Sequence, residues 1–338
     1  MLNKVAIVIL NWNGKRLLEK YLPTVVKYSP EYNVVVADNG STDDSVEFVQ
    51  THFKTVQIIR LDKNYGFTGG YNRALQQIDA EYFVLLNDDV RVTKGWINPV
   101  IKLMERDTSI AVCQPKLLSD ANPKKFEYAG AAGGYIDYLG YPFCAGRIFE
   151  HVETDTGQYD SAREIFWATG AAMFVRSKVF NELGGLDEEF FAHMEEIDFC
   201  WRAKNAGYKV MYCPDSVVYH LGGGTLNKIS PRKTFLNFRN NLLLLYKNLP
   251  EKQLKQVLRK RKYLDLLAAI VFRITSSKGE YQAVLQARKE FASMKDKFTS
   301  KRNPAVTSYP DGVYRKSLVL SSKIFHKNSF KQIENNIG

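Results

Sequence analysis

The segment YNVVVADNGSTDDS (residues 32–45) joins a β-branched strand, a polar turn and the start of a helix. The alternation of apolar runs and turn residues predicts a strand that ends at Asp38. Ser41 and Asp44 have the spacing of a capping box, which predicts that the following helix begins here and continues through Phe53. A strand followed at once by a helix is half of a βαβ unit, so this segment indicates an α/β fold.

The same alternation extends over the first 90 residues. Three more strands are expected at KVAIVIL (4–10), VQIIRL (56–61) and YFVLLNDD (82–89), with helices from about Lys15 to Tyr28 and after the glycine-rich loop in NYGFTGGYNRALQQI (64–78). We therefore predict a mostly parallel sheet flanked by helices.

Ligands of such sheets bind beyond the carboxyl ends of the strands. Asn11, Asp38, Asn64 and the pair Asp88 and Asp89 follow strand ends and should converge on one cleft.

The rest of the chain differs in character. Residues 119–165 lose clear periodicity and are expected to form an irregular, substrate-facing insertion, whereas the sequence from about Pro231 onward is helical and basic. This organisation predicts a catalytic domain over 1–248, with a nucleotide-binding half (1–90) and an acceptor half (91–230). A basic helical region should follow over 249–338.

Charge is distributed unevenly along the 338 residues. Residues 251–338 carry 19 Lys and Arg against 7 Asp and Glu, whereas residues 1–250 carry 28 against 29. A basic region suits an anionic membrane, nucleic acid or a solvated helical face. No nucleic-acid-binding motif accompanies it, so nucleic acid is not expected.

No segment has the roughly 20 apolar residues of a membrane span, and the N-terminus has no signal-peptide pattern, so a cytoplasmic protein is expected. The scattered cysteines, Cys113, Cys144, Cys200 and Cys213, are predicted to be buried free thiols.

Two acidic features follow strands of the predicted sheet. Asp88 and Asp89 offer the hard oxygen ligands that Mg²⁺ and Mn²⁺ prefer, although an ordinary turn has the same composition. Asp38 could accept hydrogen bonds from a base imide or a ribose hydroxyl, or could simply start an Asx-turn. The glycines of residues 66–70 lack the G-x-G-x-x-G spacing and follow the third strand, which argues against a Rossmann cofactor site.

Acids also crowd the start of a later helix, in FFAHMEEIDFCWR (190–202). Glu195, Glu196 and Asp198 either complement the helix dipole or, by mutual repulsion, raise one pKa toward general-base function. His220 ends a strand before three glycines, where it is either structural or faces a phosphate or metal.

Together these motifs, in this order and spacing, resemble one family. VAIVILNWNG, VVVADNGSTDDS, NYGFTGGYNRAL, VLLNDDV, WATGAAMFVRSKVFNELGGLDEEFFAHMEEIDFCWR and YHLGGGT look like family-2 inverting glycosyltransferases of the GT-A fold, in the branch of bacterial rhamnosyltransferase-like enzymes. The resemblance covers roughly residues 3–248. It implies sugar transfer from a dTDP- or UDP-linked donor, with inversion, to a glycan or lipid-linked glycan acceptor.

The resemblance also implies residue roles. Asp38 matches the acid that contacts the base or ribose, and Asn87-Asp88-Asp89 matches a DxD-type motif whose first acid is replaced. Asp89 and His220 are then the ligands of a divalent cation, Mn²⁺ or Mg²⁺. Glu195-Glu196 matches an acidic pair, usually Glu-Asp, whose second member is the base; Glu196 is a methylene longer, so Glu195 and Asp198 stay open as alternatives.

Further expected contacts are less specific. The nucleotide-sugar site should include Leu10, Asn11, Asn13, Asp38, Asn64, Gly69, Asn72, Asn87 and Asp88. The acceptor side should include Trp167, Gly170, Ala171 and Arg202.

Lipid-linked acceptors would make membrane contact useful. Stretches 263–274 and 316–327 mix apolar and basic residues, as interfacial helices do, which would place the protein peripherally at the inner face of the plasma membrane. A helical subdomain packed on the core, or a homodimer contact, would explain the same pattern.

Two other functions are weighed against glycosyl transfer. A sugar nucleotidyltransferase would be expected to carry a basic, glycine-rich loop after its first strand, where this chain has NWNGKRLL. A catalytically inactive glycan-binding scaffold would have no need for Asp38, Asp89, the acidic cluster and His220 together.

Overall fold

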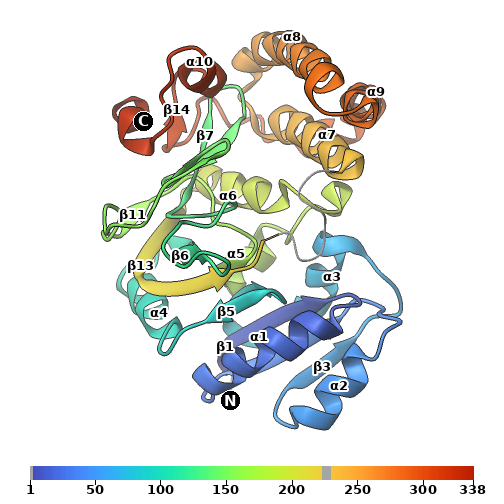
Figure 1. The fold of residues 1–338 in the computed structure, drawn as a ribbon, viewed down its shortest axis with the longest axis vertical. Coiled ribbons are helices and arrows are strands. Elements are labelled where there is room, and N and C mark those ends of the chain that lie inside the picture. The colour runs from blue at the N-terminus through green and yellow to red at the C-terminus, as the bar shows by residue number, and fades with distance from the viewer. Residues whose placement is uncertain (1–2, 223–229) are drawn as a thin grey trace.

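Aliphatic runs near the N-terminus form the centre of a nine-stranded mixed sheet in the computed structural model, which describes residues 3–222 and 230–338 (Figure 1). The strand order is β11-β13-β6-β12-β4-β1-β2-β3, and β5 pairs with β13. The strands are β1 (Asn3–Asn11), β2 (Asn33–Asp38), β3 (Gln57–Arg60), β4 (Ala80–Asn87), β5 (Val90–Val92), β6 (Ile110–Ser119), β11 (Arg163–Glu164), β12 (Ala172–Arg176) and β13 (Lys209–His220).

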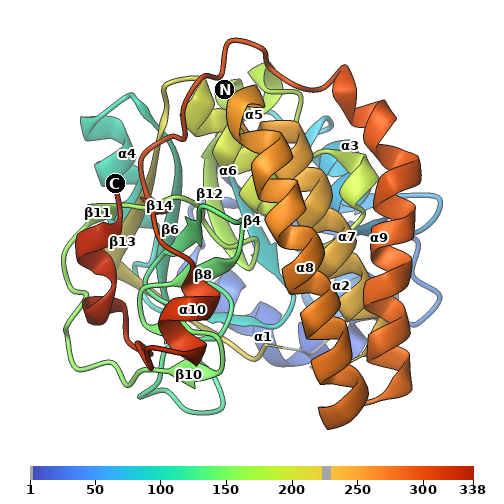
Figure 2. The ribbon, with the colours of Figure 1, turned by 90° about the horizontal axis from the view of Figure 1, so that it is seen from above.

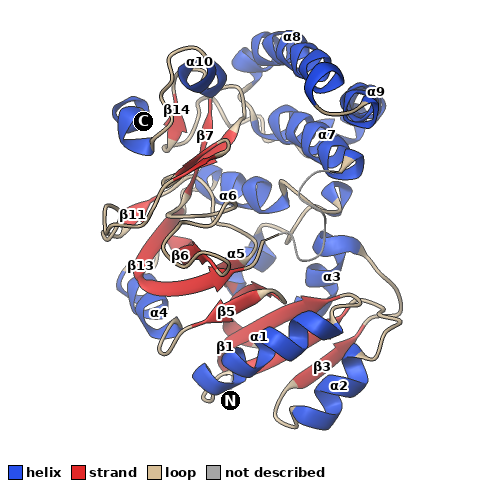
Figure 3. Cartoon of the chain, in the orientation of Figure 1, coloured by secondary structure: helices blue, strands red, loops and turns tan. Residues whose placement is uncertain are grey.

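Strand β1 shows how the sheet buries both faces. Side chains alternate across a strand, and Val5, Ile7 and Ile9 enter one hydrophobic cluster whereas Ala6 and Val8 enter the other. Helices α1 (Lys15–Tyr28), α2 (Ser45–His52) and α4 (Ile97–Arg106) cover the first face. Helices α3 (Gly66–Leu75), α5 (Ser177–Glu182) and α6 (Glu195–Asn205) cover the second (Figure 3).

The parallel core agrees with the sequence prediction. Strands β1, β2, β3 and β4 pair in parallel, and the predicted helix over residues 15–28 matches α1. The GT-A-type α/β fold class predicted from the sequence is confirmed by this architecture and by the structural likenesses described below.

The capping box predicted at Ser41 and Asp44 is wrong. Helix α2 begins at Ser45, and its N-cap residue Asp44 makes no side-chain cap hydrogen bond. The Ser41 hydroxyl instead accepts hydrogen bonds from the Asn11 side chain and the Asn13 backbone N–H. Ser41 therefore joins the loops that follow β1 and β2.

Residues 119–165 are more regular than predicted. They contain β7 (Gly134–Asp137), β8 (Pro142–Cys144), β9 (Arg147–Ile148) and β10 (His151–Val152), which form a second sheet. The fifth strand of that sheet, β14 (Val313–Tyr314), comes from the C-terminal part of the chain and pairs in parallel with β7.

The basic C-terminal region packs on the preceding part of the chain, as in the alternative of a helical subdomain packed on the core. Helices α7 (Pro231–Asn248), α8 (Glu251–Thr275) and α9 (Lys278–Thr299) form a layer over α6, at the end of the molecule opposite β1 to β3 (Figures 1 and 2). Beyond Thr299 the chain is mostly irregular, with α10 (Leu318–Lys323) and short 3-10 turns at η2 (Phe330–Gln332) and η3 (Glu334–Asn336). A further 3-10 turn, η1 (Glu188–Phe190), precedes α6.

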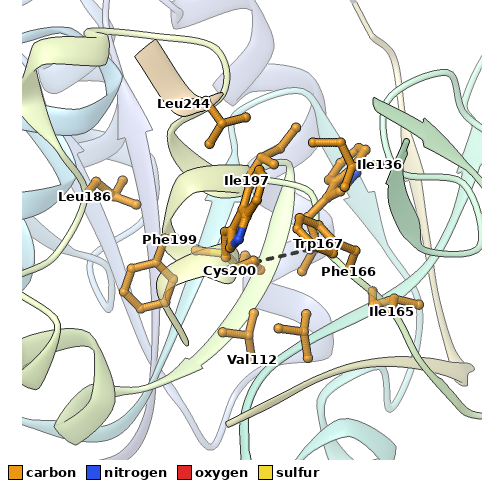
Figure 4. Packing of buried hydrophobic residues seen from close by; sticks show 14 of the residues in the cluster. Val112, Ile136, Ile165, Phe166, Trp167, Leu186, Ile197, Phe199, Cys200 and Leu244 are labelled. Atoms are coloured by element: carbon orange, nitrogen blue, oxygen red, sulfur yellow. Dashed lines mark hydrogen bonds between the residues drawn. The ribbon is translucent and has the colours of Figure 1, made fainter. Parts of the chain in front are cut away.

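The predicted buried thiols are confirmed, since all four cysteines are buried and unpaired by disulfides. Cys200 lies in the core beside Ile197, Phe199 and Trp167, and its sulfur accepts a hydrogen bond from the Ala168 backbone N–H (Figure 4). Among residues 3–222 and 230–338, no helix combines the length and apolar character that a bilayer-crossing span requires.

Candidate functional site

The carboxyl ends of β2, β1 and β4 meet at one edge of the sheet. In register, Asn11 lies opposite Asp38, and Leu10 lies opposite Asn87. The β5–β13 pairing adds His220 to the same edge, because the Leu221 N–H donates to the Asp89 carbonyl. The structure therefore brings together the predicted residues from four strand ends.

Asn11 is the buried centre of this edge. Its side-chain N–H₂ lies 3.1 Å from Asp38 Oδ1, 3.0 Å from Ser41 Oγ and 2.9 Å from Ser45 Oγ. Its Oδ1 is buried and has no hydrogen-bond partner among the described residues. An acceptor left unpaired in this way is costly, which fits a place where a ligand donor completes the arrangement.

Gly14 keeps the floor of the site open. A Cβ at this position would lie 2.5 Å from Asp88 Oδ2 and 2.6 Å from Asn11 Oδ1, so no larger residue fits without displacing them. Asp88 is nearly fully buried, and burial together with the charge of Asp89 raises its pKa to about 7. Asp88 is thus held in the site and is not a solvated turn residue.

Asn13 and Asn64 organise the surrounding loops. The Asn13 side-chain oxygen accepts from the Thr42 and Asp43 backbone N–H groups, and the Asn64 oxygen accepts from the Gly66 N–H. Asn39, which the sequence reasoning missed, donates from its amide to Asn64 Oδ1 and to the Gly66 carbonyl. Its type and position, directly after Asp38, were the only signals that could have identified it.

Two residues predicted to bind the nucleotide-sugar have structural partners in this structure. The Asn72 side chain pairs with both the N–H and the carbonyl of Leu186. Gly69 makes room for the side chains of Arg73 and Tyr65. Asn72 thus joins α3 to the loop before α6, whereas Arg73 and Tyr65 lie in α3 and directly before it. The nucleotide contact of both Asn72 and Gly69 stays a prediction.

Asp89, His220 and Glu127 form a buried charged cluster. His220 Nε2 lies 2.9 Å from Asp89 Oδ1, and His220 Nδ1 lies 3.4 Å from Glu127 Oε1. Burial alone would lower the pKa of His220, but the charges of Glu127 and Asp89 raise it to about 10. Glu127 was missed because it lies in the segment without periodicity, where a lone acid among apolar and aromatic residues was the only signal.

This cluster fits a divalent cation bound together with a phosphate ligand. Among the described residues no group of three side chains is arranged to hold a metal by itself. Asp89 supplies one carboxylate, and His220 would supply one imidazole once a cation displaces the proton from its Nε2. Mn²⁺ or Mg²⁺ at nucleotide sites takes its remaining ligands from phosphates and water. Gly223 and Gly224, two of the glycines predicted to border the site, lie outside the described residues.

Glu195 and Glu196 begin α6, where Glu195 is buried and Glu196 is half-buried. The Oε2 atoms of both side chains are buried and have no hydrogen-bond partner among the described residues. Burial raises the pKa of Glu196 to about 7, and burial and the charge of Glu196 raise the pKa of Glu195 well above its usual range. A carboxylate poised near neutral pH is suited to accept a proton.

Asp198 has a different environment. Its carboxylate lies 2.8 Å from Arg202 Nε and 2.9 Å from Lys247 Nζ, and Asn248 also donates to it. Burial raises the pKa of this group, but Lys247 and Arg202 hold it down at about 2. Asp198 therefore neutralises buried cations, and Arg202 is further fixed by the carbonyls of Leu183 and Gly185.

The loop before α6 is strained. Phe191, His193 and Met194 all adopt positive φ, between 63° and 74°, which is uncommon for residues other than glycine. The side-chain N–H₂ of Asn240, on α7, holds this loop by donating to the carbonyls of Phe190, Ala192 and His193. The helical layer thus sets the backbone that presents Glu195 and Glu196.

The same loop also contacts α3. The Phe191 carbonyl accepts from the N–H of Phe67, in the first turn of α3. His193 Nε2 is buried without a described partner, and burial and Lys233 lower the pKa of this imidazole to about 4. The loop therefore links the glycine-rich segment to the acids of α6.

The predicted acceptor-side residues divide into two groups. Gly170 and Ala171 lie between the acidic centres: a Cβ on Gly170 would be 3.9 Å from Glu196 Cβ, and the Ala171 carbonyl accepts from the Asn87 N–H. Trp167 is packed in the core against Gly134, and its Nε1–H donates to the Tyr135 carbonyl (Figure 4). Trp167 and Arg202 thus have structural partners, and their acceptor role stays a prediction.

Comparison with known proteins identifies a family and relatives that this chain resembles. The model of the family "Glycosyl transferase family 2" matches residues 6–184. N-acetylglucosaminyl-diphospho-decaprenol L-rhamnosyltransferase of Mycobacterium tuberculosis H37Rv is 25% identical over 237 residues, which are 65% of this chain and 76% of the relative.

Two solved structures show the same fold. S. aureus TarS 1–349 in complex with UDP-GlcNAc superposes with a TM-score of 0.56 at 15% identity, over 88% of this chain and 84% of that one. Mannosyltransferase PcManGT from Pyrobaculum calidifontis, in complex with GDP-Man and Mn²⁺, gives a TM-score of 0.52 at 14% identity, over 89% and 84%. At these identities the likeness concerns the fold.

Proposed function

Because this chain belongs to glycosyltransferase family 2, we propose that it moves a sugar from a nucleotide-sugar to a glycan acceptor, with metal assistance and inversion of the anomeric centre. The observation that supports this most is the adjacency of two kinds of acidic centre. Asn87, which precedes Asp88 and Asp89, donates its N–H to Ala171, and Gly170 packs beside Glu196. The edge proposed to bind the metal and the residue proposed as the base therefore border the same short segment.

The donor end of the site is proposed to bind the nucleoside diphosphate. Asp38 and the unpaired Oδ1 of Asn11 offer acceptors to donor groups of the base or ribose. Asp89 and His220 would hold a divalent cation, and the cation would neutralise the charge of the departing diphosphate. Glu127 would keep the His220 ring oriented from its opposite nitrogen, as carboxylates commonly do behind a metal-bound histidine.

The acceptor end is proposed to carry out the proton transfer. Glu196 has a pKa of about 7 because its carboxyl is buried, so a large share of it is ionised at neutral pH. It can take the proton from an acceptor hydroxyl as that oxygen attacks the anomeric carbon. A single direct displacement inverts the anomeric configuration, whereas a double displacement through an enzyme nucleophile would retain it. Asp198 is less suited to be the base, because Arg202 and Lys247 neutralise its carboxylate and lower its pKa. This favours Glu196.

The donor and acceptor are proposed at the level of class. The relative from M. tuberculosis is named for L-rhamnosyl transfer to a diphospho-decaprenol-linked sugar. This name supports a lipid-linked glycan as the acceptor. A dTDP- or UDP-linked donor and a cytoplasmic location are further parts of the proposal.

The test is a transfer assay in which the product is analysed chemically. The full-length protein is incubated with Mn²⁺, a panel of dTDP-, UDP- and GDP-sugars, and a short-chain polyprenyl-diphosphate-linked sugar. Mass spectrometry should detect a product extended by one sugar, and NMR should show that its new linkage is inverted relative to the donor. A retained linkage would contradict direct displacement, and release of inorganic diphosphate from a nucleoside triphosphate and a sugar phosphate would indicate a nucleotidyltransferase.

A further inference from the structure

Helix α8 presents a row of large apolar side chains to solvent. The row consists of Tyr263, Leu267, Ile270, Val271 and Ile274, with exposed fractions between 46% and 78%. At 100° per residue these five positions fall within an arc of about 100°, so they form one continuous stripe. We name this stripe the α8 row.

Basic residues extend the α8 row toward the N-terminus of the helix. Lys252, Arg259 and Lys260 are exposed and lie within or beside the same arc. The only acids of α8 are Glu251, at its first position, and Asp265, which is buried between Arg261 and Arg288. The exposed face of α8 is therefore apolar in one half and cationic in the other.

A second exposed apolar group lies on the neighbouring helix. Leu320 in α10 and Ile324 and Phe325 directly after it are 46% to 67% exposed. Figures 1 and 2 show α10 beside α8 at the end of the molecule opposite β1 to β3. Among the described residues, eight of the twelve exposed large apolar side chains belong to these two groups, so the apolar surface is concentrated at one end.

We propose that this face, made of the α8 row and residues 320–325, docks on an anionic lipid bilayer. Monomeric proteins rarely leave such apolar groups together in water, and apolar side chains rimmed by Lys and Arg are typical of helices that lie in the membrane interface. A second copy fits less well, because it would cover the apolar half of α8 but would offer little negative charge to the cationic half: the only exposed acid of α8 is Glu251.

Helices α7 and α8 connect this face to the loop before α6. Arg261 of α8 is buried, and it donates to Asn241 of α7 and to the Leu139 carbonyl. The adjacent Asn240 holds the loop at residues 190–193. Docking would therefore orient the acids of α6 relative to the bilayer. The inference itself rests on the surface and not on the chemistry proposed for the site.

The experiment is vesicle flotation with the full-length protein. Truncation at residue 251 is unsuitable, because α8 and α9 pack on α7 and Val313–Tyr314 complete the second sheet. Vesicles of phosphatidylglycerol and phosphatidylcholine are compared with vesicles of phosphatidylcholine alone. The wild-type protein should float with the anionic vesicles and should stay unbound with the neutral ones.

Two double variants separate the apolar and electrostatic contributions. I270D/I274D should abolish flotation. K252E/R259E should reduce the partition coefficient by about 25-fold or more, since each basic residue near an anionic surface contributes about fivefold. K102E/K178E reverses two exposed lysines outside this face and should bind like the wild type. Circular dichroism melting of each variant should match that of the wild type, because all the replaced side chains are exposed.

Three results would overturn the proposal. The first is a wild-type protein that does not float with anionic vesicles. The second is equal flotation of I270D/I274D and the wild type. The third is a concentration-dependent dimer in light scattering that I270D/I274D abolishes, since the occupant of the face would then be a second copy. The transfer assay with the short-chain acceptor contains no vesicles, so these results would leave the proposed function standing.

Discussion

The Nε2 atom of His220 lies 2.9 Å from Oδ1 of Asp89, with both side chains almost completely buried. The two residues come from β13 and from the turn between β4 and β5, which the β5–β13 pairing brings together. The proposed binding of a phosphate-bound cation rests on this confined carboxylate and imidazole. The burial of Asp89, and of Asp88 beside it, distinguishes this pair from a solvated polar turn.

Replacement of Glu127 by Gln should weaken metal binding without removing the metal ligands. Glu127 Oε1 faces Nδ1 of His220, and loss of such a partner typically reduces metal affinity by about 10- to 100-fold. The measurement is the transfer rate as a function of Mn²⁺ concentration. E127Q should require more Mn²⁺ but should approach the wild-type rate at saturation, whereas E150Q, at an exposed ion pair with Lys323, should not differ from the wild type. An unchanged Mn²⁺ dependence of E127Q would exclude this positioning role.

Replacement of Glu196 by Gln should reduce the transfer rate by about 10²-fold or more, because Gln cannot accept a proton. In the wild type, burial raises the pKa of Glu196 to about 7, so the rate should rise with pH through about 7 as the carboxyl ionises. The pH–rate profile of both proteins, with donor saturating, is the measurement. If E195Q loses the rate and E196Q keeps it, the base is Glu195.

The same substitution should stabilise the folded protein at neutral and alkaline pH. The pKa of Glu196 is about 7 in the folded state against 4.5 for an ordinary Glu, so wild-type stability falls as pH rises between these values. The E196Q variant has no ionisable group at this position, so its stability does not decrease in this way as pH rises. The difference in melting temperature between E196Q and the wild type should therefore be near zero at pH 4 and should increase up to about pH 8. A difference that does not vary with pH would show that the Glu196 carboxyl is solvated.

Replacement of Asp198 by Asn should act on stability. The carboxylate lies between Arg202 and Lys247, and removal of one partner from a buried ion-pair network costs about 3–5 kcal/mol. Urea unfolding followed by circular dichroism should show this decrease in the free energy of unfolding. If D198N unfolds like the wild type but has lost transfer, Asp198 and not Glu196 is the base.

The sequence predicted the sheet edge well because its determinants are local. β-Branched runs define β1, β2 and β4, parallel pairing brings their carboxyl ends together, and Asn11 therefore meets Asp38 as expected. The choice among the acids of α6 needed more than spacing. Asp198 differs from Glu196 because Lys247 and Asn248 reach it from α7, and no local pattern reveals that contact.

Two further features depend on contacts between distant parts of the chain. Glu127 meets His220 only after β6 and β13 pair, and its own segment shows no periodicity. The second sheet is completed when Val313–Tyr314 pair with Ile136–Asp137, and no local pattern in the C-terminal region indicates this strand pairing. The predicted capping box failed because Ser41 satisfies Asn11 and Asn13 instead of the start of α2.

The central claim is that Asp89 and His220 bind the diphosphate of the donor through a divalent cation. Isothermal titration of the wild type and of D89N with UDP, dTDP and GDP, each with Mn²⁺ and with EDTA, tests it without knowledge of the acceptor. The wild type should bind one of these nucleotides at least about tenfold more tightly with Mn²⁺. D89N should lose that gain, and D215N, at an exposed acid of β13, should keep it. Equal affinity of the wild type with Mn²⁺ and with EDTA, or an undiminished gain in D89N, would contradict the account.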